Sequence, residues 1–191
     1  MNSKKYLIVG LGNAEQKYSG TRHNIGFEVV NSLAKKLEVS FTSKRYAYKA
    51  EAKYKGRTLV LIMPTTYMNL SGNAVRYWVE KEEVELTNLL VISDDIDLPV
   101  ATLRLRPKGG GGSHNGMNHI IEILQHQNFP RMRFGIGKNY PKGYQMEYVL
   151  GSFFPEEQEL VKGTVEKAVE ACLLFCTAGL QRAMNTINNS E

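Results

Sequence analysis

One histidine near the N-terminus is the first candidate for acid–base chemistry. His23 follows a polar loop and stands just before the apolar positions of a predicted helix. The apolar residues 7–9, bounded by Gly10 and Gly12, predict a buried strand before that loop. Sites in open α/β sheets gather where strands end and helices begin, and an imidazole titrates close to neutral pH. The pattern therefore makes His23 the candidate reactive group.

Three carboxylates follow a second buried run. Asp94, Asp95 and Asp97 come at the end of the apolar stretch 89–93. One of them could accept a hydrogen bond from the imidazole and stabilise its charged form. The three could also ligate a metal, with His23 as the only strong nitrogen ligand beside them, or they could simply end the strand in a turn. The histidine–aspartate pair is the more economical interpretation.

No convincing nucleophilic side chain accompanies this pair. No serine lies in a G-x-S-x-G elbow, and Cys172 and Cys176 are spaced as reduced core residues of one helix. Water is therefore the expected attacking group. Asn13, Asn69 and Asn115 each fall at a predicted strand-to-helix junction. Their amides could orient a carbonyl group, although asparagine is also a common turn or cap residue.

Two glycine-rich segments match phosphate-binding loops only in part. Residues 10–12 begin like a dinucleotide fingerprint, but Glu15 stands where its third glycine would be. Residues 109–112 lack the Gly-Lys-Ser/Thr ending of a P-loop. This run either approaches a phosphate closely or forms a mobile loop, and no nucleotide cofactor is predicted.

The net charge of +5 is concentrated in one stretch. Residues 101–145 carry one acidic residue, Glu122, against seven basic ones: Arg104, Arg106, Lys108, Arg131, Arg133, Lys138 and Lys142. A solvated surface usually mixes its signs, whereas clustered guanidinium groups favour a phosphate-bearing partner.

The remaining composition is that of an ordinary globular protein. The 191 residues predict one domain over 1–191, and the N-terminus is typical of a first strand rather than a signal peptide. Since no apolar run approaches the roughly 20 residues needed to span a bilayer, we expect a cytoplasmic protein.

Predicted strands alternate with predicted helices, which indicates a mixed, mostly parallel sheet flanked by helices. Strands are expected at 7–9, 47–53, 57–63, 89–93, 101–106 and 132–137, with a short one possible at 148–150. Helices are expected to begin at Thr21 or Asn24, at a Ser71 cap, near His114 and at Pro155, the last running to about residue 187 with an interruption near Gly179.

Six short motifs fall in a fixed order along the chain. They are residues 10–13 with Tyr18, then 21–26, 64–72, 94–99, 112–116 and 133–137. Each is weak alone, but together they cover essentially the whole chain. In this combination the sequence resembles the bacterial peptidyl-tRNA hydrolase family.

The resemblance implies hydrolysis of the ester that joins a peptide, or an N-blocked aminoacyl group, to the 3′ end of tRNA. His23 would then be the general base that activates water, Asp94 would support it, and Asn13 would contact the peptide. The other matching substrate-contact positions are Tyr18, Tyr67, Asn69 and Asn115, with Arg106 and Arg133 as a clamp on the terminal phosphate of tRNA. The family implies a monomer with one domain, no metal and no cofactor, whose partner is tRNA rather than a membrane.

Five positions depart from the usual family pattern. Ala14 and Glu15 replace a Pro-Gly pair, Ser93 and Gly111 stand where histidine is common, and Arg106 replaces lysine. None of these changes removes a proposed catalytic group. Two alternatives stay open: a catalytically silent RNA-binding relative, and a metal-dependent hydrolase or nuclease that uses the aspartates.

Overall fold

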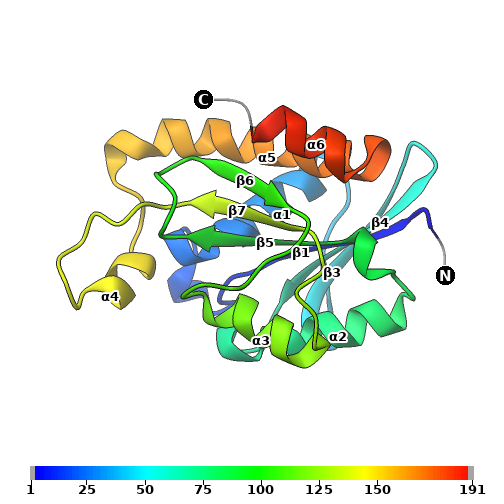
Figure 1. Ribbon diagram of the computed structural model, residues 1–191, viewed down its shortest axis with the longest axis horizontal. Coiled ribbons are helices and arrows are strands. Elements are labelled where there is room, and N and C mark those ends of the chain that lie inside the picture. Colours follow the sequence, from blue (N-terminus) through cyan, green and yellow to red (C-terminus); the bar gives the residue numbers. More distant parts are fainter. Residues whose placement is uncertain (1–2, 189–191) are drawn as a thin grey trace.

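A seven-stranded mixed sheet forms the centre of the computed structural model, which describes residues 3–188 (Figure 1). Its strands are β1 (Lys5–Gly10), β2 (Thr42–Lys44), β3 (Ala47–Tyr54), β4 (Arg57–Pro64), β5 (Leu89–Asp95), β6 (Leu103–Arg106) and β7 (Arg131–Gly135). They lie in the order β2-β3-β4-β1-β5-β7-β6. The four central strands are mutually parallel, while β2, β3 and β6 pair antiparallel at the two flanks. The predicted mixed α/β architecture is confirmed.

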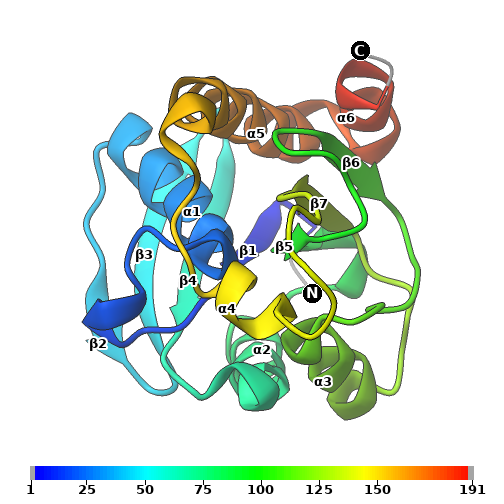
Figure 2. The same ribbon diagram turned by 90° about the vertical axis from the view of Figure 1, so that its left-hand side faces the viewer.

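Helices cover both faces of this sheet, as Figure 2 shows. They are α1 (Ile25–Lys36), α2 (Ser71–Lys81), α3 (Asn115–Leu124), α4 (Gln145–Val149), α5 (Gln158–Ala178) and α6 (Leu180–Ile187). One core lies between the sheet and α1, α5 and α6, and a second core lies beneath α2 and α3. Alternate residues of β1 enter opposite cores, which explains why the central strands are apolar throughout.

The end of β1 approaches the start of α1 so closely that both need glycine. A Cβ on Gly10 would lie 2.2 Å from the carbonyl oxygen of Gly26, and one on Gly26 would lie 2.6 Å from that of Ile92. These contacts bring the turn before α1, which carries His23, onto the carboxyl ends of β1 and β5. In Figure 1 the arrowheads of β5 and β7 point to this edge and toward α4.

The structure corrects several sequence-based expectations. Residues 148–150 are not a strand: the N–H of Tyr148 donates to the carbonyl of Tyr144 within α4. Ser71 is the first residue of α2 rather than its cap, and its hydroxyl donates to the carbonyl of Met68 in the preceding 3₁₀ turn. The exposed strand β2 was not predicted, because its polar residues carry no apolar alternation.

The long C-terminal helical region divides as predicted, at Gly179 between α5 and α6. Cys172 and Cys176 are free and buried in α5, and burial raises the pKa of the Cys172 thiol to about 12. They are therefore core side chains rather than reactive thiols, as expected. Among residues 3–188, no helix combines the length and the apolar character that a membrane crossing requires.

Candidate active site

A cavity of about 420 Å³ opens at the carboxyl edge of the sheet. Its walls come from the loop after β1, the turn before α1, the end of β5, the glycine loop before α3, and α4. The cavity gathers six of the nine predicted site residues: Asn13, Tyr18, His23, Asp94, Asn115 and Arg133. Tyr67, Asn69 and Arg106 do not line it.

The predicted histidine–aspartate pair is formed. Nδ1 of His23 lies 3.0 Å from both carboxylate oxygens of Asp94. Asp94 is buried at the end of β5, whereas the imidazole of His23 keeps one edge toward the cavity. Since an ionised carboxylate only accepts hydrogen bonds, Nδ1 carries the proton and Nε2 is left as the basic atom.

Each member of this pair shifts the pKa of the other. Burial of the His23 ring opposes protonation, but the hydrogen bond and the charge of Asp94 outweigh it and raise the pKa of His23. Burial likewise opposes ionisation of Asp94. Electrostatic attraction and hydrogen bonds from His114 and His23 outweigh the effect of burial. They hold the pKa of Asp94 well below its usual value. Asp94 is therefore ionised throughout the neutral range.

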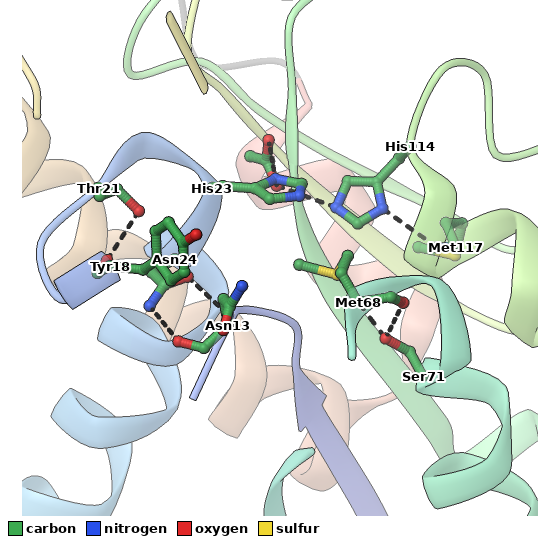
Figure 3. A network of polar contacts seen from close by, with 10 residues as sticks. Asn13, Tyr18, Thr21, His23, Asn24, Met68, Ser71, His114 and Met117 are labelled. Atoms are coloured by element: carbon green, nitrogen blue, oxygen red, sulfur yellow. Dashed lines mark hydrogen bonds and ion pairs between the residues drawn. The ribbon is translucent and has the colours of Figure 1, made fainter. Parts of the chain in front are cut away.

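A second histidine, which sequence reasoning did not assign to the site, also contacts Asp94. His114 caps α3: its Nδ1 accepts a hydrogen bond of 3.1 Å from the N–H of Met117 (Figure 3). The proton of a neutral ring must then sit on Nε2, which lies 3.0 Å from Oδ1 of Asp94. His23 is thus not the only nitrogen candidate beside the aspartates. The motif at 112–116 contained this histidine, but only the fold shows its partner.

His23, Asp94 and His114 each offer one potential ligand atom, all within 4.8 Å of one another. A metal bound by all three would need the lone pair of Nε2 of His114. That requires moving the ring proton to Nδ1 and breaking the cap hydrogen bond from Met117. The arrangement therefore favours a carboxylate that accepts hydrogen bonds from two imidazoles over a metal centre.

Asn13 is held in the cavity wall by Asn24. The side-chain oxygen of Asn24 accepts from the N–H of Asn13 at 2.7 Å, and its amide donates to the carbonyl of Asn13 at 2.9 Å (Figure 3). Asn24 occupies the cap position of α1 but makes no side-chain cap, contrary to one expectation. The side-chain oxygen of Asn13 accepts from the N–H of Glu15, while its amide N–H groups have no partner among residues 3–188. They are free to donate to a substrate carbonyl.

We expect Asn24→Ala to lower the free energy of unfolding by about 1–2 kcal/mol, because it leaves two partly buried backbone groups of Asn13 unpaired. The same substitution should lower kcat/KM roughly tenfold, since Asn13 loses its fixed position. Asn188→Ala is the matched control: that side chain bonds the N–H and carbonyl of Leu105 in the same way, on the edge strand β6. Denaturation should show a loss of stability in both variants. Kinetics should show a loss of activity only in Asn24→Ala. Equal activity in the two variants would contradict the role given to Asn24.

The basic residues of 101–145 divide into accessible and structural members. Arg133 forms an ion pair of 2.9 Å with Asp95 at the cavity. Arg106 lies two positions from it along the β6–β7 ladder, outside the cavity. Arg131 is buried, and its guanidinium donates to the carbonyls of Gly109 and Gly110. Arg131 thus positions the glycine loop and is not available to a phosphate.

Tyr67 and Asn69 lie on the segment between β4 and α2. Tyr67 is 73% exposed, and Asn69 is exposed as well. Met68, which stands between them, lines the cavity instead. The structure therefore places these two predicted contacts beside the cavity and not within it.

These features define an α/β protein whose site can activate a water molecule. A basic imidazole nitrogen faces a cavity, a buried carboxylate orients the ring, and no hydroxyl or thiol of residues 3–188 hydrogen-bonds to His23. Such a site can act as a general base without a covalent intermediate.

Comparison with known proteins agrees with this class. The family model for peptidyl-tRNA hydrolase matches residues 7–191. The peptidyl-tRNA hydrolase of Cytophaga hutchinsonii is 50% identical over 98% of this chain and all of its own length, and that of Parabacteroides distasonis is 50% identical over 97% and 99%. The crystal structure of the Acinetobacter baumannii peptidyl-tRNA hydrolase superposes with a TM-score of 0.93 at 33% identity, covering 100% of this chain and 98% of that one.

The chain belongs to the peptidyl-tRNA hydrolase family. The resemblance seen in the motifs, the hydrolase class and the fold class are thereby confirmed. The roles of the individual site residues remain predictions.

Proposed function

We propose that this protein hydrolyses the ester bond between a peptidyl or N-blocked aminoacyl group and the 3′ end of tRNA. The observation that carries the proposal is the His23–Asp94 pair at the wall of an open cavity, in a chain of the peptidyl-tRNA hydrolase family. An ester of this kind is more reactive than a peptide bond, so a water molecule activated by one imidazole is a sufficient nucleophile.

In this mechanism Nε2 of His23 takes a proton from water as the water oxygen attacks the ester carbonyl. Asp94 stabilises the imidazolium that forms, and His114 holds Asp94 by a second hydrogen bond. The C–O bond to the tRNA 3′ oxygen then breaks, and the imidazolium returns its proton to that oxygen. The free amide N–H groups of Asn13 would hold the peptide carbonyl, and Tyr18 and Asn115 contribute further polar groups to the wall.

The tRNA would be held through its phosphates. Arg133 lines the cavity together with glycines 110–112, whose lack of side chains allows a phosphate close to the backbone. Arg106 extends the positive charge along β6. Because backbone contacts carry no base information, this surface suits many different tRNAs. We propose that Tyr67 and Asn69 contact the substrate from beside the cavity, and that the protein acts as a cytoplasmic monomer on tRNA.

The test is release of an N-acetylaminoacyl group from tRNA by the wild-type protein, measured with and without EDTA pretreatment. We expect turnover that yields tRNA with a free 3′ hydroxyl and that EDTA leaves unchanged. The matched substrate is the same tRNA with an unblocked aminoacyl group, which should be cleaved much more slowly.

Two other results would replace the proposal. Binding of the blocked aminoacyl-tRNA without any cleavage would identify a catalytically silent RNA-binding relative. Loss of turnover after EDTA, with recovery on adding a divalent metal, would move the chemistry to the carboxylates of Asp94, Asp95 and Asp97.

A further inference from the structure

We propose that Arg22 is a positioning residue that holds α4 in place as a wall of the substrate cavity. Its guanidinium group stacks on aromatic rings of the segment that contains α4 and hydrogen-bonds to the backbone of that segment. The consequence for substrate binding rests on the proposed function, whereas the consequence for α4 itself does not.

Arg22 immediately precedes His23 and is only 2% exposed. Its Cζ atom lies 3.8 Å from the ring centroid of Tyr148 and 4.7 Å from that of Phe154. Nη1 also donates to the carbonyl oxygen of Tyr148 at 2.9 Å. One side chain of the turn that carries His23 therefore contacts both the last turn of α4 and the chain that follows it.

The backbone continues this contact. The N–H of Arg22 donates to the carbonyl of Gly151 at 2.9 Å, and Thr21 forms an isolated bridge with Ser152. The segment before α4 extends away from the sheet, and Figure 2 shows α4 beside the start of α1. The cavity-lining residues of this segment are Gln145, Met146, Val149 and Leu150. The contacts that hold Tyr148 and Gly151 in place therefore also hold these cavity-lining residues in place.

The buried charge of Arg22 argues that its main role is to position α4 and not to stabilise the fold. Nε and Nη2 are buried without a hydrogen-bond partner, and no ion pair within residues 3–188 includes Arg22. A buried cation without a carboxylate is unfavourable, and stacking on aromatic faces offsets this only in part. Replacing Arg22 with methionine, which has a similar length, should therefore change the free energy of unfolding little. If Arg22 only stabilised the fold, this substitution would leave binding and catalysis unaffected.

The experiment compares wild type with Arg22→Met, Arg22→Lys and Tyr148→Leu by three measurements: thermal unfolding, hydrogen exchange of residues 144–151, and steady-state kinetics. For Arg22→Met we expect exchange of 144–151 to rise at least tenfold, and KM to rise about tenfold with kcat within threefold. Arg22→Lys, which keeps the charge but not the planar fork, should lie between Arg22→Met and wild type. The double variant Arg22→Met/Tyr148→Leu should show less than the summed effect of the two single variants, because both changes remove the contact between Arg22 and Tyr148. Tyr148→Leu alone also removes the hydrogen bond from the Tyr148 hydroxyl to the carbonyl of Ile136.

Arg57→Met is the control, since the guanidinium of Arg57 likewise donates to backbone carbonyls, those of Lys55 and Thr177, far from the cavity. The acid midpoint of the pH profile should not move in any of these variants, because Arg22 contacts neither His23 nor Asp94 side chains. Unchanged exchange at 144–151 in Arg22→Met, or a loss confined to kcat, would overturn the proposal. If the wild type does not hydrolyse peptidyl-tRNA, the proposed function fails, and the exchange measurement still decides the role of Arg22.

Discussion

Replacing His23 with alanine is expected to lower kcat for an N-blocked aminoacyl-tRNA by roughly 10²–10⁴-fold, the contribution typical of a positioned general base. Nε2 of His23 is the basic atom that the Asp94 contact leaves facing the cavity. Without it, water must attack the ester with no proton acceptor. Because His23 makes no contact with Arg133 or Arg106, the affinity for tRNA should be retained.

The measurement is single-turnover hydrolysis together with a filter-binding assay for tRNA. His126→Ala is the control, since His126 is exposed and lies outside the cavity. It should hydrolyse at the wild-type rate. A His23→Ala protein that retains most of its activity would exclude His23 as the base, and one that also loses tRNA binding would show a wider disturbance of the site.

The elements that sequence analysis predicted well are those with a strong local signal. The buried runs at 7–9, 57–63 and 89–93 became β1, β4 and β5, since strands covered on both faces must be apolar throughout. The contact between His23 and Asp94 was also predictable, because Asp94 ends one central strand, His23 follows another, and the carboxyl ends of parallel strands share one edge.

The failures involve contacts between segments that are distant in sequence. His114 was visible as a motif residue, but its bond to Asp94 depends on where α3 begins relative to β5. Asn24 was expected to cap its own helix, whereas its side chain binds the backbone of Asn13 eleven residues earlier. Local patterns report which groups are polar, but the fold decides which of several possible partners each group meets.

The charge count says little about the roles of individual basic residues. Seven basic residues between 101 and 145 indicated a phosphate-bearing partner. One of them, Arg131, is buried against carbonyls of the glycine loop, and Arg133 is paired with Asp95. Arg22, outside that stretch, makes no ion pair among the described residues and was overlooked because nothing in its sequence neighbours predicts the aromatic rings around it.

Asp94→Asn is expected to reduce kcat by a similar factor, roughly 10²–10⁴-fold, with His23 still present. His114 is the reason. Its Nε2–H donates to Oδ1 of Asp94, so an asparagine would place its carbonyl oxygen there and its amide group at the other position, against Nδ1 of His23. That amide would donate to Nδ1 and shift the ring proton to Nε2, which removes the basic atom from the cavity.

The pH dependence separates this loss from unfolding. In the wild type, kcat/KM should fall as the pH drops through the pKa of His23, with a midpoint above 6.5 because Asp94 raises that pKa. In Asp94→Asn the charge and the carboxylate hydrogen bond that raise this pKa are lost, so the midpoint of the residual activity should move to lower pH than in the wild type. Glu82→Gln is the control, since Glu82 is a carboxylate paired with Lys5 and Lys49 away from the cavity; it should lose stability but keep the wild-type midpoint. An acid limb that stays in place in Asp94→Asn would show that Asp94 does not set the protonation of His23.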